Sequence, residues 1–272
     1  AGSVRIPAAC CGVVGLKTTL GLVPLTGVYP IAPIQLDTVG PIARDIDGTV
    51  RGMELLDAGF GPRYRRAVAA APSGRSLRVG RLRVRGTAPE IDRAVDDALV
   101  AAGFQVVELG ETFREQWAQA QADAITVFSV NVWMSDQKFR NQSGVTLRTK
   151  AIVAVGQLNY GKPYQEALAR IPQWKATLRG ALRRVDFIAL PTLQALPPRV
   201  PLFGGTVAFE ARVGRLQNTA AVNLAGNPAL AMPIPVRSRA VPKTSLQLVG
   251  PARSEAELLA AGRLVEAAVA AR

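Results

Sequence analysis

The chain has 272 residues, of which 49% are hydrophobic, and its 33 Lys and Arg residues against 20 Asp and Glu residues give a net charge of +13. It contains no histidine, which excludes a Ser-His-Asp triad and removes the commonest ligand of hydrolytic zinc sites. The basic residues, 27 Arg and 6 Lys, are spread along the chain, so the charge does not predict a nucleic-acid-binding surface. No apolar run of membrane-spanning length and no signal-peptide pattern is present, so we expect no membrane segment.

The chain opens on a block in which a serine follows a glycine and stands two positions before an arginine, Gly2-Ser3-Val4-Arg5-Ile6-Pro7-Ala8. A serine behind a glycine is a common way of presenting a nucleophile on a tight turn. Without imidazole, such a serine needs another base, and a lysine acting directly or through a second hydroxyl is an accepted variant. Two glycine-containing blocks follow, Cys11-Gly12-Val13-Val14-Gly15-Leu16-Lys17 and Leu36-Asp37-Thr38-Val39-Gly40-Pro41-Ile42-Ala43-Arg44.

These three blocks, in this order and at this spacing, resemble the amidase signature enzymes. The resemblance implies that Ser3 is the acylated nucleophile and that backbone N–H groups of Ala1, Gly2 and Ser3 form the oxyanion hole. In that family a second serine, preceded by a cis peptide, relays the proton to a lysine, and both lie upstream of the nucleophile block. The chain is therefore identified as the C-terminal portion of such an enzyme, and we expect this portion alone to be inactive.

Alternatives remain for several residues of these blocks. Ser3 could be an exposed serine of a frayed terminus. Lys17 could be the base, or it could make a surface or turn contact. Arg5 could anchor the turn, or it could clamp a substrate carboxylate. The adjacent Cys10 and Cys11 are poorly placed for a disulfide and are expected to be small buried side chains of a cytoplasmic protein.

The middle of the chain predicts alternating strands and helices. Residues 76–84 read as a strand, with Arg75, Arg78, Arg81, Arg83 and Arg85 on its solvated face. Residues 89–102 place Ile91, Val95 and Leu99 on one helical face, Gly103 ends that helix, and residues 104–109 form the next strand. This order predicts a βαβ unit.

Two longer helices are predicted over residues 111–140 and 163–184. The apolar surface of the first consists of Trp117, Ile125, Phe128, Val132 and Trp133. These wide side chains either pack in the core or line an acyl or amine pocket. Residues 187–192 predict a fully buried strand, and the proline-rich loop 191–201 that follows is a candidate pocket wall.

The last third again resembles the family in the blocks 223–230, 232–235 and 246–251. Where members usually carry a Gly-(Leu/Met)-Pro-x-Gly turn, this chain has Ala240-Val241-Pro242-Lys243-Thr244, so we expect an altered turn. Residues 254–257 read as a capping box that starts a final helix. The buried residues expected on that helix are Leu258, Leu259, Leu264 and Val265.

The sequence thus predicts a single, partial α/β domain over residues 1–272, a layered amidase-signature-like fold with a mixed central sheet flanked by helices and truncated at the N-terminus. The resemblance implies a cytoplasmic hydrolase of non-peptide carbon–nitrogen bonds, with a small-molecule amide as substrate. No metal or organic cofactor, no nucleic acid and no membrane is implied, and a homodimer is left open. The alternatives are a non-catalytic subunit or fragment, and the amidase component of a tRNA-dependent amidotransferase. The particular substrate is not predicted.

Overall fold

The computed structural model describes residues 2–71, 77–197, 216–238 and 241–271. The strands are β1 (Val14–Lys17), β2 (Ile42–Ala43), β3 (Arg78–Arg81), β4 (Gln105–Glu108), β5 (Phe187–Pro191), β6 (Ala229–Pro235) and β7 (Lys243–Val249). The helices are α1 (Arg5–Cys11), α2 (Ile46–Leu56), α3 (Phe60–Ala70), α4 (Pro89–Ala101), α5 (Glu111–Asp136), α6 (Leu147–Asn159), α7 (Lys162–Leu182), α9 (Ala220–Ala225) and α10 (Glu255–Ala270), with a 3₁₀ turn, η1, at Gln137–Phe139.

In the described part of the chain, the seven strands form one mixed sheet in the order β2-β1-β6-β7-β5-β3-β4. Strand β3 pairs in parallel with β4 and β5, which confirms the predicted βαβ unit, and the pairs from β5 to β2 are antiparallel. Gly103, at φ +73°, lies in the left-handed region just after Ala102, the C-cap of α4, as the pattern predicts. The predicted α/β class with a mixed central sheet is therefore confirmed.

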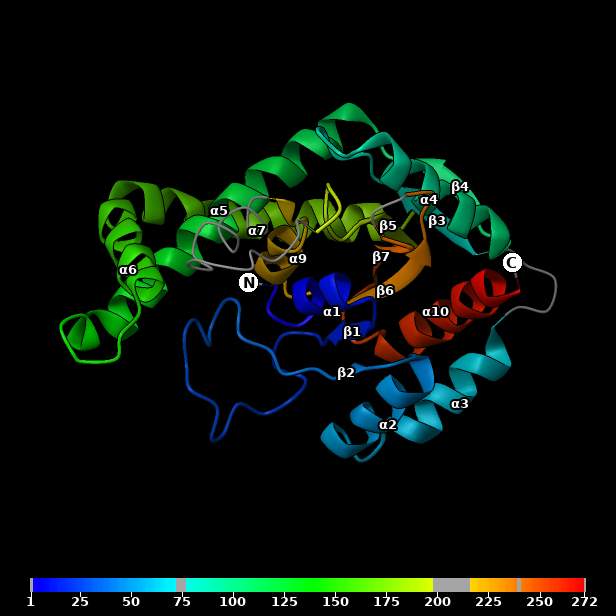
Figure 1. Cartoon of the computed structure of the whole chain (residues 1–272), viewed down its shortest axis with the longest axis horizontal. Coiled ribbons are helices and arrows are strands. Elements are labelled where there is room, and N and C mark those ends of the chain that lie inside the picture. The colour runs from blue at the N-terminus through cyan, green and yellow to red at the C-terminus, as the bar shows by residue number, and fades with distance from the viewer. Residues whose placement is uncertain (1, 72–76, 198–215, 239–240, 272) are drawn as a thin grey trace.

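Helices cover both faces of this sheet (Figure 1). Helices α2, α3, α4 and α10 bury their apolar faces in one core, and α5, α7 and α9 contribute to the other. Strand β5 lies between the two cores, because Phe187 and Ala189 belong to the first while Ile188 and Leu190 belong to the second. Successive side chains of a strand point to opposite faces, so a strand covered on both sides is apolar throughout, as predicted for this segment.

The predicted solvated arginine face of the strand at 76–84 is wrong at Arg81. This side chain is fully buried and pairs with Asp92 and Asp96, both on α4. Arg78 and Arg85 are exposed, and Arg75 lies outside the described residues. Alternation with apolar residues indicates a strand but not which polar side chain meets a covering helix.

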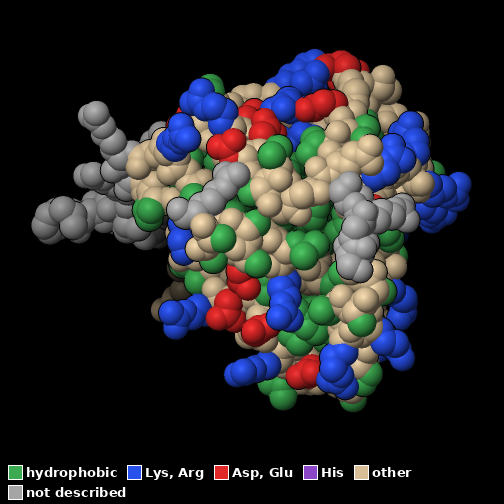
Figure 2. Space-filling view, turned by 90° about the vertical axis from the view of Figure 1, so that its right-hand side faces the viewer, with side chains coloured by type: hydrophobic (Ala, Val, Ile, Leu, Met, Phe, Trp, Pro, Cys, Tyr) green, Lys and Arg blue, Asp and Glu red, His purple; other side chains and the backbone are tan. Residues whose placement is uncertain are grey.

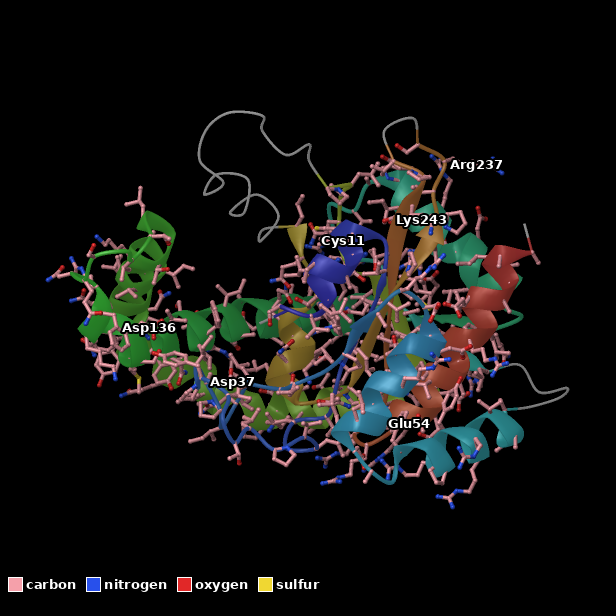
Figure 3. All side chains as sticks on the ribbon, turned by 60° about the horizontal axis from the view of Figure 1, so that its bottom comes forward. Cys11, Asp37, Glu54, Asp136, Arg237 and Lys243 are labelled. Carbon is pink, nitrogen blue, oxygen red and sulfur yellow. The ribbon has the colours of Figure 1, made fainter. Side chains whose placement is uncertain are left out.

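The two cysteines are exposed, which corrects the expectation that they are buried. Cys11 is labelled in Figure 3. Helix α1 buries only Arg5, Ala8 and Ala9, which share one face at helical spacing. Cys10 and Cys11 fall on the other face. The Cys10 thiol is still partly shielded from water, and this partial desolvation, followed by the neighbouring Cys11, raises its pKa.

Three details of other helices also differ from expectation. On α5, Trp117 and Val132 are buried but Ile125 is 46% exposed, and on α10, Leu264 is 39% exposed. Ser254 stands at the N-cap of α10, yet its hydroxyl donates to the carbonyl oxygen of Pro251, so the predicted capping box does not form. Part of the turn predicted to be altered, Ala240, lies outside the described residues.

On the face of the molecule shown in Figure 2, Lys and Arg side chains are interspersed with Asp and Glu. In the described ranges, no helix is long and apolar enough to cross a membrane.

Candidate active site

Ser3 lies on a sharp turn that only glycine can form at the preceding position. Gly2 has a φ of +112°, in the region that favours glycine, and a Cβ there would overlap the Thr219 hydroxyl and approach Ile6 Cδ1 to 2.8 Å. The Ile6 N–H donates to the Gly2 carbonyl oxygen at 2.8 Å, which closes the turn at the start of α1. Ser3 itself is exposed. The turn therefore projects this serine away from the core.

Glycines of the other two blocks allow close packing behind this turn. A Cβ on Gly15 of β1 would lie 2.7 Å from Ala8 Cβ of α1. A Cβ on Gly40 would overlap the Leu16 carbonyl oxygen, so residue 40 can approach β1 only as glycine. The glycine pattern in the sequence thus corresponds to the packing of α1, β1 and the segment around Gly40.

Arg5 is fully buried and anchors the turn through the hydrogen bonds of its guanidinium. It donates to Gln247 Oε1 on β7, to Asn223 Oδ1 on α9, and to the Thr219 carbonyl oxygen at 3.0 Å. Among the described residues no carboxylate pairs with this guanidinium, and burial lowers its pKa to about 9. Because both Nη atoms already donate to the protein, the geometry favours the anchoring role of Arg5 over a carboxylate clamp.

The acceptors of Arg5 belong to a buried polar network. Gln247 Nε2 donates to the Asn218 carbonyl oxygen at 3.0 Å, and Asn223 Nδ2 donates to the Leu36 carbonyl oxygen at 3.3 Å. Sequence reasoning missed this role of Gln247 and Asn223. A signal was present, because each is a polar residue within a run of apolar ones. Buried polar groups of this kind require partners.

Lys17 is 2% exposed, and its Nζ donates to the carbonyl oxygens of Thr18 and Asn227, each at 2.8 Å. Burial, with a smaller effect of Arg5, holds the pKa of Lys17 well below its usual range, and Glu255 opposes this shift. A lowered pKa would suit a base. The two carbonyl contacts instead give Lys17 a structural task, which is to join the end of β1 to the residues that precede β6.

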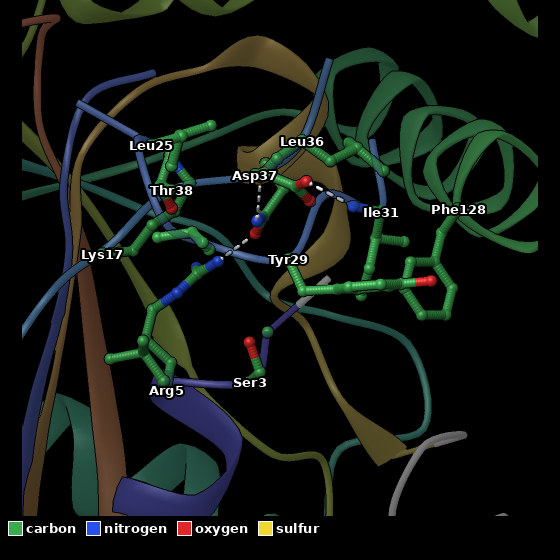
Figure 4. Close-up of a pocket in the computed structure, with 14 residues that line it drawn as sticks. Ser3, Arg5, Lys17, Leu25, Tyr29, Ile31, Leu36, Asp37, Thr38 and Phe128 are labelled. Carbon is green, nitrogen blue, oxygen red and sulfur yellow. Dashed lines mark hydrogen bonds between the residues drawn. The ribbon is translucent and has the colours of Figure 1, made fainter. Parts of the chain in front are cut away.

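A cavity of about 180 Å³ opens beside Ser3 (Figure 4). Its lining comes from the N-terminal turn and the start of α1, the end of β1, the loop 18–41, α5 and α9. It consists of Gly2, Ser3, Val4, Arg5, Lys17, Leu25, Val28, Tyr29, Ile31, Leu36, Asp37, Thr38, Phe128 and Asn223. Asp37 Oδ2 shapes the loop by accepting from the N–H groups of Ile31 and Ala32, at 2.8 and 2.9 Å. Within the described residues, the Ser3 hydroxyl has no hydrogen-bond partner.

The structure brings most of the predicted site together. Ser3, Gly2, Arg5 and Lys17 all line one cavity, while Ala1 lies outside the described residues. The N–H groups of Gly2 and Ser3 donate to no described residue. Phe128 is the α5 aromatic that reaches the cavity, whereas Trp117 packs in the core. The described part of the predicted pocket wall, 191–197, does not line it, and 198–201 lie outside the described residues.

Comparison of the sequence with known proteins supports the family resemblance of the N-terminal blocks. The family model described as Amidase matches residues 1–259. The chain is 31% identical over 289 residues to 2-amino-5-chloromuconic acid deaminase of Comamonas testosteroni, an alignment that covers 99% of the chain and 59% of that protein. It is 30% identical over 306 residues to one subunit of the Glutamyl-tRNA(Gln) amidotransferase of Thermus thermophilus, covering 99% of the chain and 63% of that relative. The chain therefore belongs to the Amidase family, that of the amidase signature enzymes.

Solved structures agree at the level of the fold. The structure of 6-aminohexanoate cyclic dimer hydrolase complexed with substrate superimposes with a TM-score of 0.76 at 20% identity, covering 100% of this chain and 64% of that one. At this identity the likeness speaks for the fold alone. The chain spans about three fifths of the length of these relatives.

Proposed function

We propose that the protein hydrolyses a carbon–nitrogen bond of a small-molecule carboxamide, with Ser3 as the acylated nucleophile. The observation that carries this proposal is the exposed Ser3, presented on a turn that requires glycine and bordering a cavity, in a chain of the Amidase family. Membership supports amide chemistry, and the turn supports the choice of serine. The proposal includes neither a metal nor an organic cofactor, and it places the protein in the cytoplasm.

In the proposed reaction the Ser3 hydroxyl loses its proton and its oxygen attacks the carbonyl carbon, so that a C–O bond forms and negative charge develops on the carbonyl oxygen. Backbone N–H groups of Ala1, Gly2 and Ser3 stabilise this oxyanion, and one such donor typically contributes ~3 to 4 kcal/mol. The C–N bond then breaks, and ammonia or an amine leaves with a proton. Water attacks the acyl-enzyme, releases the acid and restores the Ser3 hydroxyl.

A proton acceptor for Ser3 is the remaining requirement, because general-base assistance contributes typically 10² to 10⁴-fold. Within the described residues Lys17 is the buried lysine of this cavity, but its Nζ already donates to two carbonyl oxygens. We propose that the proton passes through a second serine to a different lysine, as the family resemblance implies, and that Lys17 supports the structure.

The runner-up function is that of the amidase component of a tRNA-dependent amidotransferase. It is favoured by the 30% identity to the Thermus thermophilus amidotransferase over nearly the whole chain. An enzyme of that kind would release ammonia from an amide for use by partner subunits, through the same serine.

The test is to label the full-length protein encoded by the gene with a fluorophosphonate probe and to assay simple aryl and alkyl amides. We expect Ser3→Ala to abolish labelling and hydrolysis. Lys17→Met, if it folds, should retain labelling, which separates a structural Lys17 from a base. Full activity of the alanine variant would contradict the assignment of Ser3. Loss of labelling in a folded Lys17→Met protein would make Lys17 the base.

A further inference from the structure

The cavity beside Ser3 has a mainly polar side and a mainly apolar side. Arg5, Lys17 and Thr38 lie on one side, while Ile31, Tyr29 and Phe128 lie on the other, toward α5 (Figure 4). Val28 and Leu36 add to the apolar lining from the same loop as Ile31 and Tyr29, and Leu25 of that loop lies on the other side, next to Thr38. The side formed by Tyr29, Ile31 and Phe128 therefore comes from two segments about a hundred residues apart in sequence.

Most polar atoms of the charged side chains in this cavity are already engaged by the protein, while Arg5 Nε is buried without a partner among the described residues. Both Nη atoms of Arg5 and the Nζ of Lys17 donate to amide or carbonyl oxygens, and Asp37 Oδ2 accepts from two backbone N–H groups. The side chains left for a ligand are mainly the apolar ones. Val28 and Tyr29 are 44% and 58% exposed, so a bound group would remove apolar surface from water at both.

Tyr29 also joins the loop to α5. Its hydroxyl donates to Asp136 Oδ1 at 2.9 Å, at the C-terminal end of α5, and this hydrogen bond is the main cause of the raised pKa of Tyr29. Phe128 lies on the same helix, two turns before Asp136. The hydrogen bond thus holds the Tyr29 wall in place relative to the Phe128 wall.

We propose that this wall, formed by Tyr29 and Phe128 with the apolar side chains of the loop, is the acyl subsite, and that it selects amides of uncharged, extended aliphatic or aromatic acids. The inference rests on the proposed function. The acyl group stays bonded to Ser3 after the amine has left, so it needs a binding site beside Ser3 in both steps of the reaction, and the cavity that borders Ser3 can supply it. The amine must instead depart and be replaced by water. Tyr29 and Phe128 are then specificity-determining residues.

The test uses two series of substrates with the full-length protein, one varying the acyl chain from acetyl to hexanoyl and benzoyl on a fixed aniline, and one varying the amine on a fixed acyl group. We expect kcat/KM to rise about fourfold per added acyl methylene, the fold-change that corresponds to burying one CH₂, until the cavity is full. Lengthening the amine should have no such effect. Alkyl fluorophosphonates of matching length should show the same order in their rates of Ser3 labelling.

Variants locate the effect. Tyr29→Ala and Phe128→Ala should each lower kcat/KM for the hexanoyl amide about tenfold while changing the acetyl amide less than threefold. Tyr29→Phe keeps the ring but removes the hydrogen bond to Asp136, so it should weaken the dependence on acyl length without abolishing it. Ile34→Ala is the matched control, because Ile34 is 80% exposed on the same loop and does not line the cavity.

The outcomes separate this inference from the function on which it rests. Ser3-dependent hydrolysis that ignores acyl length, or that follows amine length instead, would overturn the inference and leave the proposed function intact. An unchanged acyl preference in both alanine variants would do the same. A protein in which no probe labels Ser3 would overturn both.

Discussion

At the scale of single residues, the sequence motifs correspond to positions where a side chain would not fit. Gly40 and Gly180 differ sharply in this respect. A Cβ on Gly40 overlaps the Leu16 carbonyl oxygen, whereas a Cβ on Gly180, exposed on α7, meets nothing within 4 Å. One glycine is therefore required by packing and the other is only tolerated.

We expect Gly40→Ala to lower the free energy of unfolding by about 1 to 3 kcal/mol, since the backbone must shift to admit the methyl group. Gly180→Ala should raise it by ~0.5 to 1 kcal/mol, because alanine is the better helix former. Urea denaturation with an unchanged m-value measures both. Equal effects of the two substitutions would show that the contact at Gly40 does not constrain the fold.

Lys17 predicts a pH dependence of stability. Its pKa in the folded protein is lowered by burial, so between that pKa and about 10.4 the unfolded chain binds the proton that the folded chain does not. The free energy of unfolding should therefore rise with pH across this window, by at most about 1.4 kcal/mol per pH unit, and should fall as pH decreases through it. Chemical denaturation between pH 7 and 10 measures the slope.

Lys17→Met should remove this contribution to the slope, whatever its effect on stability at one pH. Lys162→Met is the control, because it makes the same substitution at a lysine whose side chain is 86% exposed. A wild-type slope that persists in Lys17→Met would show that other groups cause it.

At the scale of elements, the unit β3-α4-β4 is held together by charge as well as by apolar packing. Arg81 is buried between β3 and α4, with Asp92 and Asp96 as its partners, while Arg83 reaches Asp96 and Glu108 from a side chain that is 42% exposed. The two arginines are two residues apart and differ mainly in burial. They therefore form a matched pair for measuring what burial contributes.

Arg81→Met should destabilise the protein by roughly 3 kcal/mol, the lower end of the range for breaking a buried pair, because its carboxylate partners remain partly solvated. Arg83→Met should cost at most about 1 kcal/mol, as exposed pairs do. Thermal or urea unfolding measures the loss of stability in each variant. An equal loss of unfolding free energy in the Arg83 and Arg81 variants would refute the role assigned to burial.

At the scale of the whole molecule, the chain carries a net charge of +13. On the face shown in Figure 2, basic and acidic side chains are mixed and do not form separate patches. Non-specific attraction to polyanions depends on how many phosphates can be neutralised together, and it weakens steeply with salt. A dispersed charge therefore predicts weak contact with nucleic acid.

That residues 1–272 form a single domain also stays a prediction.

We expect a fluorescent DNA duplex to bind detectably at about 20 mM salt and to dissociate by about 200 mM, with no dissociation constant tighter than the non-specific range of ~10⁻⁴ to 10⁻⁶ M at physiological salt. Fluorescence anisotropy over this range of salt gives the result. Tight binding that survives 200 mM salt would point to a nucleic-acid partner and count against the interpretation of the charge as dispersed.

Local pattern in the amino-acid sequence was enough for several features of this protein. The βαβ unit follows from apolar periodicity and Gly103, the buried β5 from a continuous apolar run, and the placement of Ser3 from its glycine-containing block. The family follows from the three blocks near the N-terminus, and the Amidase family model matches residues 1–259. These signals are readable because neighbouring residues alone decide them.

Tertiary packing was needed to establish which side chains meet across the chain. Arg5 donates a hydrogen bond to Gln247, 242 positions away, and Tyr29 donates one to Asp136. On α5, Phe128 lines the cavity and Trp117 does not. The same holds for the buried Arg81 and the exposed Cys11. Helical or strand spacing gives the face on which a residue lies, but what covers that face depends on packing between elements that are distant in sequence.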